Sequence, residues 1–236
     1  MLVSDRVGRS RSALSPFSAR RLAAAAMVGV VLYVLVDVLL QFLPPHYSPI
    51  SDAESNLAVG PYGWVMNLNF LGRALSTVCA AVAIGLTDQA SSLRRAGLAL
   101  MVVAGACSAA LAFLPTDIHR PGDFGLSTST STGALHLAVA SVGFLAALAA
   151  FALLTGWLRR SPRLRRGYRP ALALVVVAAV GLLSVSLADR FAPNLTGLAE
   201  RVCLVGILGW VFVACAAIRS AEPARQSSEG WATPIT

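Results

Sequence analysis

Six long runs of apolar residues limit how this chain can fold more than any other feature of its sequence. They cover residues 22–43, 62–86, 96–114, 134–158, 170–188 and 198–218. A helix of about 20 apolar residues crosses a hydrocarbon core of about 30 Å, and these runs are apolar on nearly every side. Backbone groups in lipid must be bonded within the protein, and the alternating segments of a barrel are missing. The sequence therefore predicts an all-α, polytopic membrane protein with six transmembrane helices.

The overall composition supports the same class of protein. Hydrophobic residues make up 56% of the 236 residues, charged residues only 13%, and the mean hydropathy is +0.71. Soluble domains carry about 25% charged residues, and disordered chains are polar and highly charged. These values exclude both an ordinary soluble domain and a disordered chain.

The positions of the basic residues predict the orientation in the membrane. All 19 basic residues are arginines, and most lie before the first run, between alternate runs, or after the last run. Basic residues accumulate on the cytoplasmic side of membrane proteins. We therefore expect a multi-pass protein of the inner (plasma) membrane with both termini in the cytoplasm. Its parts are a basic cytoplasmic tail at 1–21, a transmembrane domain at 22–218 and a second cytoplasmic tail at 219–236.

The net charge of +8 is explained by this topology and does not indicate a nucleic-acid partner. No nucleic-acid reading element accompanies the arginines, so the expected partners are the bilayer and its anionic lipids. The four cysteines all lie in predicted helices and none belongs to a CxxC pair. They indicate neither a disulfide framework nor a cysteine metal site.

Acidic residues and histidines gather on the predicted outer side. His46 and His119 lie in outer loops, and His136 lies just inside the fourth helix. Asp117 and His136 are expected at the same depth, with the loop that carries Asp52 covering the same face. The hypothesis is that Asp52, Asp117 and His136 form a ligand-binding site. The competing interpretation is that Asp117 ends a helical turn and His136 bonds to a backbone carbonyl group.

The same residues also suggest a metal site. Histidine and carboxylate side chains bind divalent metals such as zinc, and an open coordination position can activate water. His119, His136 and Asp117 are the candidate ligands.

Two ionisable residues lie within the predicted membrane spans. Asp37 lies in the first helix, on one stripe with Tyr33 and Gln41, and Arg73 lies near the middle of the second helix. A charge within a bilayer is costly unless it is paired or faces water. We expect an Asp37–Arg73 pair, which either holds the two helices together or lines a polar cavity open to the outside.

Two sets of residues resemble a known family. The first set comprises Ser51-Asp52, the run 60–63, Asn69-Phe70 and Gly72. The second is the run 113–117, Phe-Leu-Pro-Thr-Asp, followed by His136 at the start of the next helix. Together they resemble the bacterial and archaeal membrane family called domain of unknown function 998. The resemblance implies about six membrane helices and no agreed activity, so it supplies no catalytic residue. The Ser/Thr-rich stretch before residue 133 departs from the family by separating aspartate from histidine more widely.

Three classes of function remain open at this level. The chain has no GxxxxGK[ST], GxGxxG, HExxH or GxSxG motif, so the common nucleotide-binding and protease chemistries are disfavoured. The first class is a protein that binds a lipid head group or small ligand at an extracytoplasmic Asp/His site. The alternatives are a proton-coupled transporter of small solutes and a metal-assisted membrane hydrolase.

Overall fold

The computed structural model describes residues 16–44, 47–87, 90–117 and 124–221. These residues contain no strand, and the long helices are α1 (Pro16–Leu40), α2 (Gly63–Gly85), α3 (Ser92–Leu111), α4 (Ser131–Arg160), α5 (Tyr168–Phe191) and α6 (Thr196–Ser220). Short 3-10 helices connect them: η1 (Glu54–Ala58), η2 (Arg165–Gly167) and η3 (Pro193–Leu195). All six long helices are long and apolar enough to cross a membrane. The prediction of an all-α protein with six spans is confirmed. The tails predicted at 1–21 and 219–236 lie mostly outside the described residues.

Local signals explain three of the differences between the observed and the predicted helix ends. α1 ends at Leu40 and α3 at Leu111, each three residues earlier than predicted. Prolines at 44 and 115 follow closely, and a proline ring sterically disfavours the helical conformation of the residue before it. α4 begins three residues early, because the side chain of Thr130 accepts a hydrogen bond from the Gly133 N–H and caps the helix.

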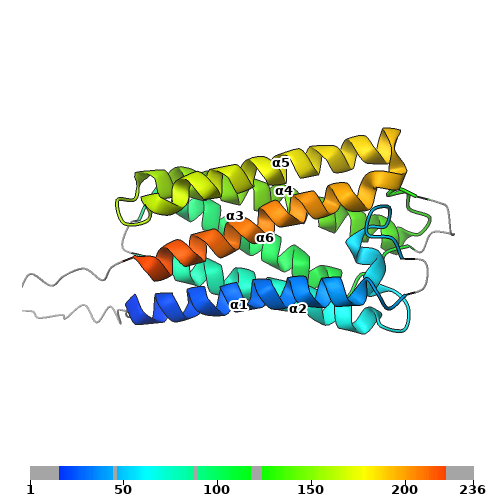
Figure 1. Ribbon diagram of the computed structural model, residues 1–236, viewed down its shortest axis with the longest axis horizontal. Coiled ribbons are helices and arrows are strands. Elements are labelled where there is room, and N and C mark those ends of the chain that lie inside the picture. The colour runs from blue at the N-terminus through cyan, green and yellow to red at the C-terminus, as the bar shows by residue number, and fades with distance from the viewer. Residues whose placement is uncertain (1–15, 45–46, 88–89, 118–123, 222–236) are drawn as a thin grey trace, which may run out of the picture.

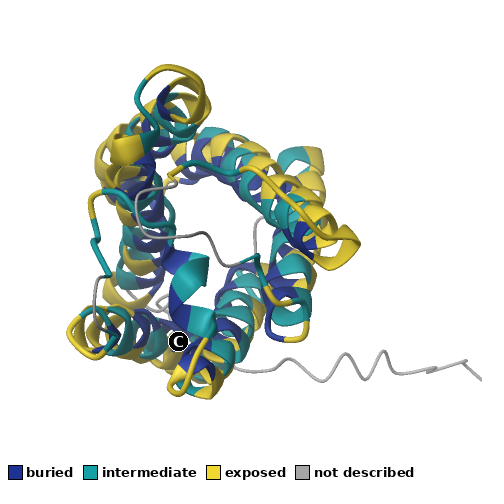
Figure 2. Cartoon of the chain, turned by 90° about the vertical axis from the view of Figure 1, so that its right-hand side faces the viewer, coloured by how far each residue is buried: buried dark blue, intermediate teal, exposed yellow. Residues whose placement is uncertain are grey.

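The helices form a ring in chain order. Each helix packs against the next along the chain, and α6 closes the ring against α1. Figure 2 shows this ring viewed along the bundle. Among neighbouring helices, the contact between α4 and α5 is the least extensive. α6 is the most buried helix, with 56% of its most apolar stretch inside the protein against 22–33% for the others.

Glycines allow the closest helix contacts. A Cβ atom on Gly181 of α5 would lie 2.2 Å from the backbone nitrogen of Cys203, and one on Gly206 of α6 would lie 2.4 Å from that of Ala178. In the same way, a Cβ atom on Gly97 of α3 would lie 2.6 Å from Leu154 of α4. Small residues let membrane helices approach closely. They make α3/α4 and α5/α6 two tight pairs, with a looser seam between α4 and α5.

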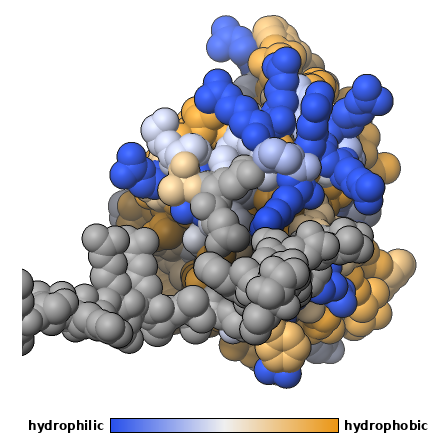
Figure 3. All heavy atoms as spheres, turned by 90° about the vertical axis from the view of Figure 1, so that its left-hand side faces the viewer, coloured by the Kyte–Doolittle hydropathy of each residue, from blue (hydrophilic) through white to orange (hydrophobic). Residues whose placement is uncertain are grey.

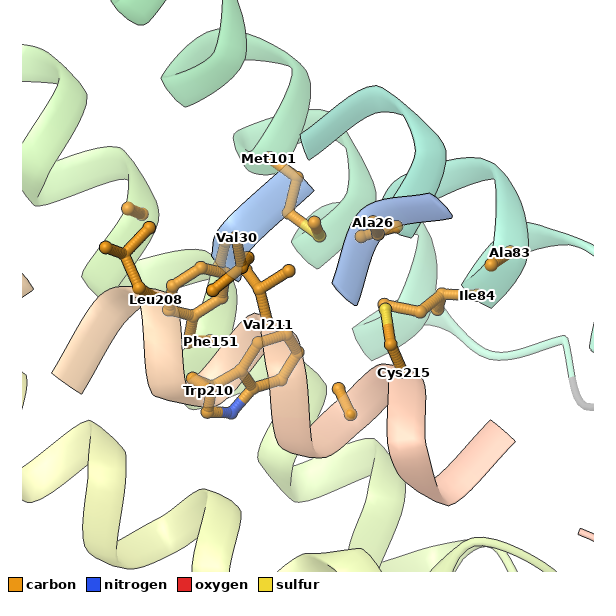
Figure 4. Close-up of a cluster of buried hydrophobic side chains, with 14 of the residues drawn as sticks. Ala26, Val30, Ala83, Ile84, Met101, Phe151, Leu208, Trp210, Val211 and Cys215 are labelled. Carbon is orange, nitrogen blue, oxygen red and sulfur yellow. The ribbon is translucent and has the colours of Figure 1, made fainter. Parts of the chain in front are cut away.

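An aromatic contact fixes the C-terminal half of α4 to α6. The rings of Phe151 and Trp210 stack with centroids 4.2 Å apart, and the Trp210 indole donates a hydrogen bond of 2.8 Å to Thr155 Oγ1. Figure 4 shows these rings among side chains from α1, α2, α3 and α6. In the N-terminal half of α4, by contrast, only Gly133 and His136 are buried up to residue 145. α4 is therefore anchored at one half and lightly packed at the other.

The two ends of the bundle differ in chemistry. Figure 3 views one end directly and shows hydrophilic side chains gathered on it. The described helix ends and connections there carry Arg20, Arg21, Arg94, Arg95, Arg159, Arg160, Arg163, Arg165, Arg166, Arg169 and Arg219. We call this the arginine-rich end. The opposite end, here the η1 end, contains η1 and the connections α1–α2, α3–α4 and α5–α6 (right-hand side of Figure 1).

The orientation expected from the arginines, with the arginine-rich end in the cytoplasm, can be tested by cysteine labelling. With the four native cysteines replaced by alanine, Thr128→Cys places a thiol at the η1 end and Arg166→Cys one at the arginine-rich end; both positions are exposed. A membrane-impermeant maleimide should label Thr128→Cys on intact cells, and Arg166→Cys only after lysis, because arginines remain in the cytoplasm. Labelling of both variants on intact cells would contradict the six-span topology.

Candidate functional site

Arg73 is the central residue of the polar cluster at the η1 end. Its Nε donates to Ser108 Oγ of α3 at 2.9 Å, and its Nη1 donates to Tyr33 Oη of α1 at 2.9 Å. The guanidinium also lies 5.1 Å from the ring centroids of Tyr33 and Phe70, within the range of a cation–π contact. Arg73 of α2 thus connects three helices.

Glu54 supplies the negative charge opposite Arg73. Its Oε2 lies 3.6 Å from Arg73 Nη1, and its side chain is only 3% exposed. The carboxylate comes from η1, which folds into the end of the bundle against α2 and α6. Burial raises the pKa of Glu54 above its usual range, and the charge of Arg73 opposes that shift. Glu54 Oε1 is buried and has no hydrogen-bond partner among the described residues.

Glu200 of α6 completes the cluster. Its Oε2 accepts a hydrogen bond of 2.7 Å from the backbone N–H of Glu54. Thr196, one helical turn earlier, is 1% exposed, and its Oγ1 has no hydrogen-bond partner in the described part of the chain. Residues four apart lie on the same face of a helix. Glu200 and Thr196 therefore present their oxygens on the side of α6 that meets η1.

The predicted Asp37–Arg73 ion pair is replaced by the Glu54–Arg73 pair. Both Asp37 and Arg73 are described, and no salt bridge joins them. Asp37 instead accepts a hydrogen bond of 2.8 Å from Gln41 Nε2, one turn along α1. Arg73 lies at the depth of Tyr33 in the bundle, one helical turn deeper than Asp37. Because η1 folds inward, Glu54 reaches the same depth as Arg73. α1 and α2 are neighbours as predicted, but the partner of the arginine comes from the loop.

A second arginine fastens the α1–α2 loop to the start of α6. Arg201 Nη1 donates to the carbonyl oxygens of Asp52 and Gly197, each at 3.1 Å, and Nη2 donates to Tyr47 Oη. The Leu198 N–H donates to the Ile50 carbonyl at 2.8 Å. These bonds hold the segment that leads into η1. The Asp52 carboxylate bonds within its own loop, where its Oδ2 accepts a hydrogen bond of 2.7 Å from the Ser48 N–H.

Asp117 and His136 also have structural partners. Asp117 accepts hydrogen bonds from the N–H groups of Ser129 and Thr130 at 2.6 and 3.0 Å and from Thr130 Oγ1 at 2.5 Å. These bonds lower the pKa of Asp117 to about 2. His136 is 4% exposed, and its Nδ1 lies 2.6 Å from the Leu114 carbonyl oxygen. Since a carbonyl only accepts, Nδ1 carries the proton. Both residues fasten the α3–α4 connection to α4.

The candidate site of Asp52, Asp117 and His136 is therefore not the cluster that the fold assembles. Each of the three bonds to its own segment or to the adjacent connection. Among the described residues, no group of three His, Cys, Asp or Glu side chains is placed to hold a metal ion. Of the predicted metal ligands, Asp117 and His136 are engaged as above, and His119 lies outside the described residues.

A cavity of about 460 Å³ adjoins the polar cluster. Its polar lining includes Glu54, Arg73, His136, Asp189, Thr196 and Glu200, and its apolar lining includes Phe70, Leu137, Phe144, Leu145 and Leu182. A smaller, mostly apolar cavity of about 60 Å³ lies beyond Arg73, which borders both. Pockets for small ligands have about 300–1,000 Å³ with a few polar groups among apolar ones. The larger cavity has the size and the mixed lining of a binding site.

The site residues predicted from the sequence did not include Glu54 and Glu200. The small number of glutamates in the chain was the one sequence feature that could have pointed to them. The chain has four glutamates, of which Glu222 and Glu229 lie in the C-terminal tail. The other two are the ones that meet beside Arg73. An arginine in the middle of a span must be paired or face water, but spacing along the chain does not select its partner.

A comparison with protein families identifies the chain. The family model described as "Protein of unknown function (DUF998)" matches residues 27–217. The chain belongs to this family. The match includes most of α1 and α6 and everything between them, and it confirms the resemblance noted in the sequence. Searches of the curated proteins and of the solved structures found no match.

The ion pair of this DUF998 protein is testable by a double-mutant cycle. Arg73→Leu removes the cation that pairs with the buried Glu54 carboxylate in the described part of the chain, and should destabilise the fold by about 3 kcal/mol. Adding Glu54→Leu should recover part of the loss, because removal of both partners leaves no stranded charge. Adding Asp37→Leu serves as the control and should give additive effects. Thermal unfolding in detergent is measured for the wild type, the three single variants and the two double variants, and recovery by Asp37→Leu alone would refute the assignment.

The Asp117 contacts predict a pH-dependent contribution to stability. The pKa of Asp117 in the fold is lowered to about 2, below its ordinary value of about 3.9. The stabilisation is therefore complete above about pH 4 and is lost as the pH falls toward 2. The difference in Tm between the wild type and Asp117→Asn should be largest at neutral pH and should shrink across this interval. A constant difference from pH 5 to pH 2 would contradict the role of the ionised carboxylate.

Proposed function

We propose that this protein binds the head group of a membrane amphiphile in the cavity at the η1 end. In the orientation that the arginines favour, this cavity faces the outside of the cell membrane. The head group would bind beside Glu54, Glu200 and Arg73, and His136 forms part of the cavity wall. The extracytoplasmic ligand site expected from the sequence is thus moved from the aspartates to the buried glutamates.

The observation that carries this proposal is the mixed lining of the cavity. One part consists of the buried charged cluster, and the other consists of apolar side chains of α4 and α5, such as Leu137, Leu145 and Leu182. A ligand that fills the space must offer both a polar group and an apolar body. Membrane amphiphiles combine these two parts, and the surrounding bilayer supplies them at high concentration.

The buried charges also support a binding role. Arg73 and Glu54 form a pair that is largely removed from water, and buried ion pairs are weak sources of stability compared with apolar packing. Two oxygens beside the pair, Glu54 Oε1 and Thr196 Oγ1, have no partner among the described residues. Buried polar atoms are nearly always bonded. A bound head group would supply the missing partners.

The proposal predicts that lipid remains with the purified protein and that filling the cavity removes it. Ala140 borders both cavities, so Ala140→Phe places a phenyl ring in the binding space. Ala149→Phe is the matched control, because it makes the same change on an exposed position of α4. We expect native mass spectrometry to detect bound lipid on the wild type and on Ala149→Phe, and at least about tenfold less on Ala140→Phe.

A measurement of thermal stability controls for loss of folding in this experiment. The Tm of each variant shows that the protein is folded when it is analysed. Equal lipid retention by a folded Ala140→Phe variant and the wild type would refute binding in the cavity, as would a wild type free of lipid.

A further inference from the structure

We propose that the ligand is a lipid with a primary amine in its head group, which enters sideways between α4 and α5 and places its ammonium group between Glu54 and Glu200. This inference rests on the proposed function and adds the chemical class of the ligand and its route. It is carried by the acceptor groups at the polar end of the cavity and by the exposed residues at its side.

The described wall of the cavity carries more acidic than basic side chains. Arg73 is the one arginine in the described cavity wall, and its Nε and Nη1 already bond to Ser108, Tyr33 and Glu54. The acidic side chains of the wall are Glu54, Glu200 and Asp189, and Asp189 Oδ1 already accepts a hydrogen bond of 2.6 Å from the Leu126 N–H. The lining therefore favours a ligand that is positively charged and donates hydrogen bonds.

Three acceptors are arranged to receive such a group. Glu54 and Glu200 are held together by the 2.7 Å bond from the Glu54 N–H to Glu200 Oε2, and Glu54 Oε1 remains unpartnered. Thr196, one turn from Glu200 on α6, contributes the unpartnered Oγ1. Glu54 and Thr196 are 2% and 1% exposed, so bulk water does not satisfy these atoms. A primary ammonium has three N–H donors, which matches the carboxylates and the hydroxyl.

The side of the cavity opens between α4 and α5. Leu145 of α4 lines the cavity and is nevertheless 59% exposed, and Ser141 of α4 and Ser186 of α5 are likewise both lining and exposed. A residue that borders the cavity and the outer surface at once marks a mouth. α4 and α5 have the least extensive contact in the ring. The mouth therefore coincides with the seam that lacks close packing.

The depth of this mouth places it in hydrocarbon. Leu137 and Leu145 lie about 12 Å apart along α4, at 1.5 Å per residue, and Leu145 is 14 residues into the helix. The hydroxyls of Ser141 and Ser186 bond to the carbonyl groups of Leu137 and Leu182 in their own helices. They present no unpaired donor to the membrane. An acyl chain can occupy this mouth while the head group reaches the glutamates.

The test compares lipids that differ only in the head group. The wild type in detergent is offered phosphatidylethanolamine, phosphatidylcholine or phosphatidylglycerol with identical chains, and retention is measured by native mass spectrometry. Phosphatidylethanolamine should be retained at least about tenfold better, since phosphatidylcholine lacks N–H donors and phosphatidylglycerol lacks the amine. Glu200→Gln should reduce this preference. Equal retention of all three lipids would overturn the inference but leave the proposed function intact, whereas no retention of any lipid would refute both.

The route is tested with a matched pair of tryptophan variants. Leu145→Trp obstructs the mouth, and Leu135→Trp changes an equally exposed leucine of α4 that does not line the cavity. Uptake of phosphatidylethanolamine from vesicles should be at least about tenfold slower for Leu145→Trp and unchanged for Leu135→Trp. Soluble glycerophosphoethanolamine, which has the head group without the chains, should not compete. Unchanged uptake by Leu145→Trp, or full competition by the soluble compound, would overturn lateral entry.

Discussion

The neutralisation of Arg73 is the constraint on which the η1 end of this protein depends. A guanidinium near the middle of a membrane span is tolerated only when it is paired or faces water. Here the pairing comes from Glu54, which is 3.6 Å away and lies on a connection between helices. To deliver that carboxylate, the connection must fold back into the bundle as η1. The buried charge of Arg73 therefore accounts for the position of η1 inside the bundle.

Other contacts follow from that inward fold. The segment before η1 is fastened to α6 by Arg201 and by the bond from Leu198 to Ile50. Glu200 receives the Glu54 N–H and is drawn into the same cluster. Tyr33 and Ser108 complete the surroundings of the guanidinium. The polar cluster joins four of the six helices at one end, while the aromatic and aliphatic core runs along the whole bundle.

Uneven helix packing leaves room for the cavity. Glycines bring α5 against α6 and α3 against α4 so closely that even a methyl group would collide with the neighbouring helix. The stacked rings of Phe151 and Trp210 then hold the C-terminal half of α4 against α6. No comparable contact closes the N-terminal half of α4 against α5 in the described residues. The result is two tightly packed helix pairs with one loosely packed seam between them.

The sequence by itself determined the class of the protein and the number of helices, because apolar length acts locally, and it placed the helix ends only approximately. It also marked Arg73 as a buried charge in need of a partner. Only the tertiary structure decided that this partner is Glu54 and not Asp37, and that Asp117 and His136 serve as structural contacts. The reason is physical: several carboxylates lie within reach along the chain, and the choice depends on how the connections fold over the bundle. The cavity and its open seam arise from packing between segments far apart in sequence, which no local pattern records.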